Sequence, residues 1–174
     1  MIIDKEIVSK IPWDYAFITG IFDIDAKYFK KRIEEGVQSS NINYKTNVVG
    51  QHTEWKFFNN DKKFLTLLFQ INDYLENLNI KLCGYHLKEA WGLIENFGEY
   101  TKKHDHLPAY LSGSLYINDH YQKLYFPEIN QEITPQKGRF VIFSSFLQHY
   151  TKRNLRDMLK YAISFNFHAQ GLKK

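Results

Sequence analysis

The chain has 174 residues, about the size of one ordinary domain, and can bury a sizeable core without disulfide bonds. A hydrophobic fraction of 44% and an aromatic fraction of 17% exclude a disordered chain. The single cysteine, Cys83, excludes both an internal disulfide and a cysteine-rich zinc module.

The formal net charge of +4 comes from small, scattered basic clusters, so nucleic acid is not expected as a partner. The N-terminal stretch MIIDKEIVSKIPWD carries charges inside what would have to be the apolar part of a signal peptide. No run approaches the ~18 apolar residues of a membrane-spanning helix. Together with the lone cysteine, these features predict a soluble, cytoplasmic protein with no membrane partner.

The first predicted helix runs from about residue 25 to residue 37, because Phe29, Ile33 and Val37 recur every four residues on one face. The polar segment that follows, residues 38–60, is too long and irregular for a simple connection. Loops of this length in compact domains often act as lids or binding loops. We therefore expect this segment to shape the entrance to a site.

The second predicted helix begins after Asn60, which is expected to cap it. Its apolar stripe consists of Phe64, Leu67, Leu68, Ile71, Leu75 and Leu78. A single apolar stripe of this kind is typical of a helix that packs on a sheet.

From about residue 81 onward the pattern changes to six or seven short aromatic and β-branched runs typical of strands. Pro135 and Gly138 predict a tight reversal, and the stretch NDHYQ predicts a hairpin loop between Ile117 and Leu124. Helices followed by short strands predict a single α+β domain over residues 1–174. Its helical support is expected over about 1–80, and an antiparallel sandwich or jelly-roll core over about 81–168.

Two histidines, His104 and His106, flank Asp105 in a run that reads as strand. Residues two apart on a strand point to the same face, so both imidazoles would project together, ~6.6 Å apart at Cα, while Asp105 points away. Such a pair can bind one metal ion if His149 completes the set, although paired histidines near a strand end are also often merely solvated or hydrogen-bonded. The other histidines are interpreted as structural or surface residues: His52, His86, His120 and His168.

The segment from residue 81 to 168 resembles the Fe(II)- and 2-oxoglutarate-dependent dioxygenases, in particular the small prolyl-4-hydroxylase-like proteins of marine phages and bacteria. The resemblance rests on four pieces in this order: EAWGLIENFGEYTKKHDH, LSGSLYIND, TPQKGRFVIFSSFLQH and KYAISFNF. It covers about half of the chain. It implies a double-stranded β-helix core, the cupin-like form of the jelly roll, with the N-terminal helices packed on one sheet.

The resemblance also implies roles for individual residues. His104, His106 and His149 would hold Fe(II), and no catalytic residue is implied beyond this metal centre. Tyr116 matches the position that contacts the far carboxylate of the cosubstrate 2-oxoglutarate. Lys160 occupies the place of the usual arginine that binds the same carboxylate.

Strand alternation supports these roles independently of the resemblance, because the two strand faces can line one cavity. One strand face carries Ser112, Ser114 and Tyr116, and one face of the last strand carries Lys160, Ala162 and Ser164. By the resemblance Ser164 adds a hydrogen bond to the cosubstrate, and Ser112 is a further candidate for binding it. A buried lysine needs an anionic partner, which the cosubstrate would supply, whereas a surface position for Lys160 is the alternative.

One departure from the resemblance concerns the middle ligand, because the usual set is two histidines and one carboxylate. Three neutral histidines could hold Fe(II), a bulge could swing Asp105 inward, or the site could have lost turnover. We favour three histidines, with His106 in the middle position.

The implied activity is a hydroxylase that acts on a peptide or small molecule, consumes O2 and releases succinate and CO2. If the chain is phage-encoded, the host cytoplasm is its expected location. Two other functions remain open: a three-histidine cupin that oxidises a thiol without 2-oxoglutarate, and a non-catalytic jelly-roll module that binds a ligand or protein.

Overall fold

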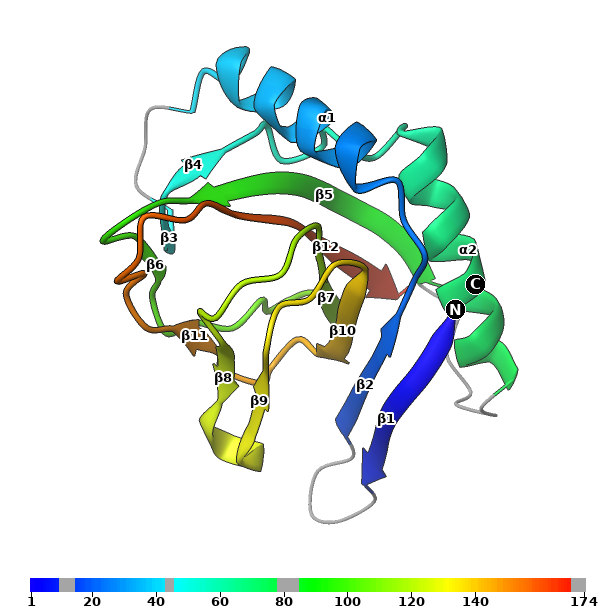
Figure 1. The fold of residues 1–174 in the computed structure, drawn as a ribbon. Helices are drawn as coiled ribbons and strands as arrows, with labels where there is room; N and C mark the ends of the chain where they lie inside the picture. The colour runs from blue at the N-terminus through cyan, green and yellow to red at the C-terminus, as the bar shows by residue number, and fades with distance from the viewer. Residues whose placement is uncertain (10–14, 43–45, 78–84, 170–174) are drawn as a thin grey trace.

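The structure, a computed structural model, describes residues 1–9, 15–42, 46–77 and 85–169. Two helices cover one face of a large antiparallel sheet, and a smaller sheet faces its other side (Figure 1). The α+β class predicted from the sequence is confirmed.

The large sheet has seven strands in the order β1-β2-β10-β7-β12-β5-β4. Its members are β1 (Ile2–Ser9), β2 (Tyr15–Ile21), β4 (Gln51–His52), β5 (Tyr85–Glu95), β7 (Leu111–Tyr116), β10 (Arg139–Ser144) and β12 (Lys160–Ala169). Neighbouring strands pair antiparallel throughout. The long pairing of β12 with β5 and β7 fixes the middle of the sheet, where the candidate site lies.

The smaller sheet has the order β11-β8-β9, and a separate pair joins β3 to β6. These strands are β3 (Val48–Val49), β6 (Tyr100–Thr101), β8 (Leu124–Phe126), β9 (Gln131–Ile133) and β11 (Tyr150–Thr151). In Figure 1 they lie on the side of the large sheet opposite the helices. The space between the sheets is therefore the inside of the sandwich.

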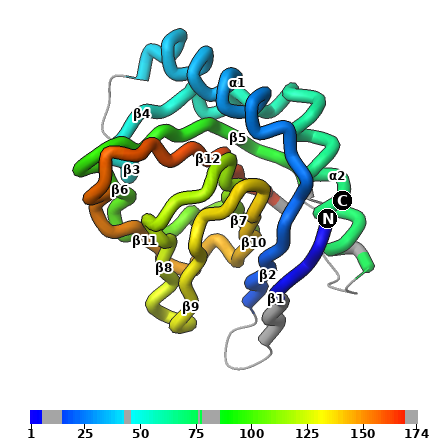
Figure 2. The backbone as a smooth tube through the Cα atoms, viewed as in Figure 1, coloured from blue at the N-terminus to red at the C-terminus, as the bar shows by residue number. Residues whose placement is uncertain are grey.

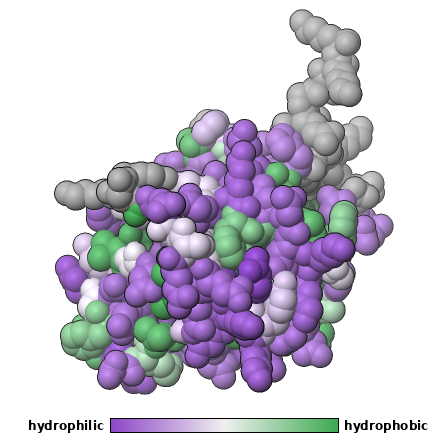
Figure 3. Space-filling view, turned by 90° about the horizontal axis from the view of Figure 1, so that it is seen from above, coloured by the Kyte–Doolittle hydropathy of each residue, from purple (hydrophilic) through white to green (hydrophobic). Residues whose placement is uncertain are grey.

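Helix α1 (Ala26–Gln38) agrees with the predicted first helix. The Asp25 side chain caps it by accepting a hydrogen bond from the Tyr28 amide at 3.0 Å, and Phe29 and Ile33 are buried. The outward surface above the helices is mainly hydrophilic with scattered apolar side chains (Figure 3), as expected for amphipathic helices.

Helix α2 (Lys62–Asn77) starts one residue later than predicted. Asp61, rather than the exposed Asn60, caps it, because the Asp61 Oδ1 atom accepts a hydrogen bond from the Phe64 amide at 3.0 Å. The predicted stripe is buried from Phe64 to Leu75, while Leu78 lies outside the described residues. Neither helix is long and apolar enough to cross a membrane in the part of the chain that the structure describes.

Strand alternation divides the core into two parts. On β10, Phe140 and Ile142 pack toward the helices, while Val141 and Phe143 pack toward the smaller sheet. The first cluster anchors α1 and α2 to the outer face of the large sheet. The second fills the sandwich next to the site.

The N-terminal segment differs from the prediction of helical support over about 1–80. β1 and β2 precede α1 and extend the large sheet at the edge opposite β4 (Figure 2). Their pairing runs through β2 to β10, from Arg139 opposite Ile21 to Phe143 opposite Phe17. The continuous apolar run before α1 is typical of a strand buried on both faces, but periodicity alone does not separate that from a buried helix.

The connection after β7 is also different from the prediction. β7 belongs to the large sheet and β8 to the smaller one, so the NDHYQ stretch carries the chain between sheets and does not form a hairpin. The hairpin instead joins β8 to β9 through the 3₁₀ turn η1 (Pro127–Ile129). The predicted reversal before β10 is confirmed, with Gly138 at φ +80° and the Arg139 amide donating to the Gln136 carbonyl at 2.9 Å.

Candidate metal centre and adjoining cavity

Backbone hydrogen bonds place the three histidines. The His104 amide donates to the His149 carbonyl at 3.1 Å, and the His149 amide donates back at 2.9 Å. The two residues thus form an isolated antiparallel bridge, and His106 is held by its amide donating to the Ser145 carbonyl at 2.9 Å. The H-x-H motif lies beyond β6 and not in a continuous strand as predicted, but this bridge fixes it against the segment that carries His149.

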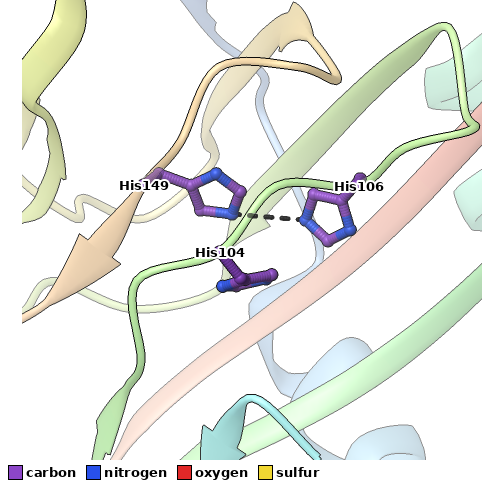
Figure 4. Close-up of side chains that lie close together, drawn as sticks. All are labelled: His104, His106 and His149. Atoms are coloured by element: carbon purple, nitrogen blue, oxygen red, sulfur yellow. Dashed lines mark hydrogen bonds between the residues drawn. The ribbon is translucent and has the colours of Figure 1, made fainter.

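The three imidazoles lie close together (Figure 4). One ligand nitrogen from each of His104, His106 and His149 lies within 4.8 Å of the others. The Nε2 atoms of His106 and His149 are 3.2 Å apart. Two nitrogens bound ~2.1 Å from one ion at a right angle would lie ~3 Å apart, so this spacing fits adjacent ligands of one metal ion.

The ring protons of two of these histidines are directed away from the common point. His104 donates from Nδ1 to the Lys102 carbonyl at 2.8 Å, and His149 donates from Nδ1 to the Leu147 carbonyl at 3.1 Å. A carbonyl can only accept, so Nδ1 carries the proton and Nε2 keeps its lone pair. Such contacts to the second ring nitrogen orient metal-binding histidines.

Burial keeps the imidazoles neutral. It lowers the pKa of His104, lowers that of His106 well below its usual range, and lowers that of His149 to about 3. A positive charge on a neighbouring ring would further oppose protonation of His106 and His149. The apolar surroundings include the Phe143 ring, whose centroid is 4.8 Å from that of His149. Neutral imidazoles are the form that binds metal.

Asp105 does not join the cluster. Its Oδ1 atom accepts a hydrogen bond from the Leu107 amide at 3.2 Å. Within the described ranges, the group that can hold a metal consists of His104, His106 and His149. The geometry therefore favours the three-histidine alternative over an inward carboxylate.

The inner faces of β5, β12 and β7 form the wall beside the histidines. Cross-strand register groups their residues in four rows: Glu95 with Lys160; Leu93, Ala162 and Tyr116; Trp91, Ser164 and Ser114; and Glu89, Asn166 and Ser112. Successive rows are ~7 Å apart, since same-face residues on a strand lie two positions apart. Lys160 and Ser112 therefore lie at opposite ends of this wall.

A cavity of about 40 Å³ joins the histidines to the first three rows. Its lining includes His104, His106, His149, Tyr116 and Lys160. Ser114 and Ser164 also line it, and their hydroxyl oxygens are 3.1 Å apart. The structure thus brings together the predicted metal ligands and three of the four predicted cosubstrate contacts.

Ser112 is the exception among the predicted residues. It does not line the cavity, and its hydroxyl is bonded to the Ser145 hydroxyl at 2.8 Å and to the Asn166 side-chain oxygen at 2.7 Å. Asn166 in turn donates to Glu89 at 2.7 Å. Ser112 belongs to this hydrogen-bonded row, and Ser114 takes its place on the cavity wall.

Lys160 is buried, which excludes the surface alternative. Its Nζ atom forms an ion pair with the Oε2 atom of Glu95, directly opposite on β5, and both side chains are less than 5% exposed. The Glu95 Oε1 atom accepts a hydrogen bond from the Thr101 hydroxyl at 3.2 Å. The expectation that a buried lysine needs an anion is met by the protein itself.

Glu95 is the residue that the sequence analysis missed. The stretch EAWGLIE does indicate that Glu95 points inward, because Trp91, Leu93 and Glu95 occupy alternate positions of β5 and share one face. A carboxylate that continues an inward apolar alternation needs a partner inside. Tyr116 lies near it, and burial together with the charge of Glu95 raises the pKa of the Tyr116 phenol, which stays protonated.

The remaining histidines stay outside the cluster. His120 is buried and structural: its Nε2 atom contacts the Met158 carbonyl at 3.1 Å and its Nδ1 atom accepts from the Gln122 amide at 3.1 Å. His86 is exposed. His52 and His168 line a second cavity of about 370 Å³, which also borders His104 and His106.

This second cavity has an aromatic and acidic lining. Trp55 and Trp91 contribute indole rings, and Glu89 and Asp105 contribute carboxylates. Part of the predicted loop also borders it, through residues 46–48. The histidine cluster therefore borders both a small cavity that reaches Lys160 and, through His104 and His106, a larger one.

Neither a model of a known protein family nor a curated protein matches this chain. Several solved structures match it in fold. A viral collagen prolyl hydroxylase from Paramecium bursaria Chlorella virus-1, solved with 2-oxoglutarate, is 13% identical, with a TM-score of 0.68 over 88% of this chain and 96% of that one. A prolyl-4-hydroxylase from Pseudomonas putida is 15% identical, with a TM-score of 0.62 over 89% of this chain and 93% of that one.

A prolyl hydroxylase from Trichoplax adhaerens, solved with a peptide fragment of hypoxia-inducible factor, is 15% identical, with a TM-score of 0.65 over 89% of this chain and 83% of that one. A likeness at such low identity is a likeness of fold. The chain therefore has the double-stranded β-helix fold of the prolyl hydroxylases and other 2-oxoglutarate-dependent oxygenases, as its resemblance to them predicted.

Proposed function

We propose that this protein is an Fe(II)- and 2-oxoglutarate-dependent dioxygenase that hydroxylates a peptide or small molecule. The observation that carries the proposal is one cavity with three neutral, converging histidines at one end and the ammonium of Lys160 at the other. A metal and a cation at opposite ends of a cavity are suited to a 2-oxo acid with a carboxylate at its far end.

His104, His106 and His149 would hold Fe(II), and the Nε2 atoms of His104 and His149 keep a lone pair for the metal. When bound, Fe(II) with 2-oxoglutarate would supply the activation of O2 that oxidises a C–H bond and yields succinate and CO2. The protein contributes a fixed ligand geometry and a largely apolar wall of Trp91, Leu93 and Ala162.

Three other groups would orient the cosubstrate. Lys160 would donate to the far carboxylate, and the protonated phenol of Tyr116 would add a second donor. Ser164 would supply a hydroxyl group, because it lies on the same inner face of β12 as Lys160, four residues further along the strand. The primary substrate would reach the metal from the larger cavity beside His104 and His106, whose volume of about 370 Å³ suits one side chain of a peptide or a small molecule.

One observation favours a second candidate, a three-histidine dioxygenase that acts without 2-oxoglutarate. Because Glu95 already neutralises Lys160, the lysine does not by itself require a dicarboxylate ligand. The cavity beside Lys160 is also small, with a volume of about 40 Å³.

Metal analysis and product analysis separate the two candidates. The purified protein is reconstituted with Fe(II), exposed to O2 with and without 2-oxoglutarate, and assayed for succinate. We expect succinate that depends on both Fe(II) and 2-oxoglutarate, and its loss in His149→Ala. Oxygen consumption with a small thiol and no succinate would instead establish the second candidate.

A further inference from the structure

The far end of the small cavity contains an internal carboxylate. Glu95 faces Lys160 across the β5 and β12 pairing, with relative exposures of 1% and 3%. Both of its oxygens are engaged, Oε2 by Lys160 and Oε1 by Thr101. The position where a far carboxylate would meet Lys160 therefore already has an anion beside it.

Charge counting shows the consequence for a dicarboxylate. Glu95 and Lys160 sum to zero, and Tyr116 is held protonated. A second carboxylate would put two anions beside one ammonium in a buried space, where like charges repel strongly. The ligand must therefore displace Glu95 from Lys160 or bind with weakened affinity.

The cavity is small, and Glu95 forms part of its wall. About 40 Å³ is room for a few water molecules at most. The Glu95 side chain is one of the groups that line this space, so its movement would enlarge the cavity at the end where the far carboxylate must go.

We propose that Glu95 is a specificity-determining residue that competes with the cosubstrate's far carboxylate for Lys160. This inference rests on the proposed 2-oxoglutarate chemistry. Glu95 lowers the affinity for a dicarboxylate. It does not lower the affinity for a 2-oxo acid whose far end is neutral. A carboxamide suits the ion pair, because its oxygen can accept from Lys160 while its amide group donates to Glu95.

The first test measures 2-oxoglutarate binding by titration calorimetry on Fe(II)-loaded protein without oxygen, for the parent chain and Glu95→Gln. Glutamine keeps the shape and removes the competing charge. A charge-assisted hydrogen bond that Lys160 can give fully to the ligand corresponds to a gain of about 10-fold or more in affinity. Iron content should not change.

Glu132→Gln is the matched control. Glu132 also forms an ion pair with a lysine, Lys123, but on the surface, so this variant makes the same change in net charge. We expect its affinity for 2-oxoglutarate to equal that of the parent. A gain in both variants would indicate a general charge effect and overturn the proposal.

A second test needs no variant and remains available if Glu95→Gln does not fold. The parent chain is titrated with 2-oxoglutarate and with 2-oxoglutaramate, which carries a carboxamide at the far end. We expect affinities within about threefold of each other, whereas a lysine free of competition would lose about 10-fold or more with the amide. A clear preference of the parent for the dicarboxylate would overturn the proposal.

The outcomes also separate this inference from the proposed function. If the parent binds 2-oxoglutarate and Glu95→Gln binds no tighter, the role of Glu95 is wrong and the proposed function stands. If only Glu95→Gln binds, the competition by Glu95 is supported, and the parent chain is not a 2-oxoglutarate enzyme. If neither protein binds either 2-oxo acid while both retain iron, the 2-oxoglutarate chemistry is wrong and this inference falls with it.

Discussion

Lys160 and Glu95 are direct cross-strand partners, the first residue of β12 opposite the last residue of β5, and they form an ion pair inside the molecule. An ion pair in this position is expensive to break from one side only, because the remaining charge is left buried. The same ion pair joins two central strands and lines the cavity, so a change in either residue should affect both the stability of the fold and ligand binding.

Loss of the lysine alone should destabilise the fold. Lys160→Met leaves Glu95 buried without its cation, and we expect the free energy of unfolding to fall by about 3 to 5 kcal/mol. The double variant Lys160→Met with Glu95→Gln leaves no buried charge and should recover part of that loss. Urea unfolding monitored by tryptophan fluorescence gives these values, and a double variant less stable than the single one would contradict the buried pair.

Metal binding should depend on each histidine of the cluster. We expect purified His104→Ala, His106→Ala and His149→Ala to lose most of their iron, and the triple variant to retain none, because two imidazoles alone hold Fe(II) weakly. Elemental analysis after reconstitution provides the measurement. His86→Ala removes an exposed histidine and should bind iron like the parent chain, and stoichiometric iron in the triple variant would show that the site is elsewhere.

The middle ligand should tolerate a carboxylate. His106→Asp restores the set of two histidines and one carboxylate that non-haem iron sites commonly use. We expect this variant to bind iron and to support some succinate formation. Because aspartate is shorter than histidine, its carboxylate lies further from the metal position, and we expect weaker iron binding than in the parent chain. A folded variant with no iron would show that this backbone requires three imidazoles.

The pH dependence follows from burial. Unfolded histidines take up protons below ~6.5, whereas the pKa of His149 in the folded protein is lowered to about 3, so the unfolded state binds more protons in this window. The free energy of unfolding of the metal-free protein should therefore decrease as pH falls from ~6.5 towards 3, by about 1.4 kcal/mol per pH unit for each such histidine. His149→Gln should reduce that slope, and an unchanged slope would contradict the burial of His149 as a neutral ring.

Metal affinity should follow the same direction. Burial lowers the pKa values of His104 and His106 as well, so protons compete with the metal only below the ~6.5 of a free histidine. The sequence alone predicts that protons compete with the metal near pH ~6.5, because the burial of a histidine cannot be read from an H-x-H motif. Burial moves it to lower pH.

The resemblance and strand parity together predicted which residues of the candidate site lie close to one another. The H-x-H motif and His149 are the residues that converge, and strand parity placed Tyr116, Lys160 and Ser164 on one cavity. The prediction from strand parity was wrong for Ser112. This residue shares a strand face with the cavity residues, but it lies one row beyond the cavity. Where a cavity ends is decided by packing across strands.

The missed features depend on contacts distant in sequence. Glu95 and Lys160 are paired by the register of β5 with β12, which no local pattern encodes. The same holds for β1 and β2, whose assignment depends on pairing with β10, and for the stretch after β7, whose ends belong to different sheets. Tertiary pairing decides such cases where local periodicity is ambiguous.

The most direct test of the account is the visible absorption spectrum of Fe(II)-loaded protein, recorded without oxygen before and after 2-oxoglutarate is added. Binding of 2-oxoglutarate to Fe(II) held by the three histidines would give a charge-transfer band that neither partner shows alone. We predict that this band appears with the parent chain and is absent with His149→Ala. An iron-replete parent protein that shows no band at saturating 2-oxoglutarate would contradict the assignment of this site to 2-oxoglutarate chemistry.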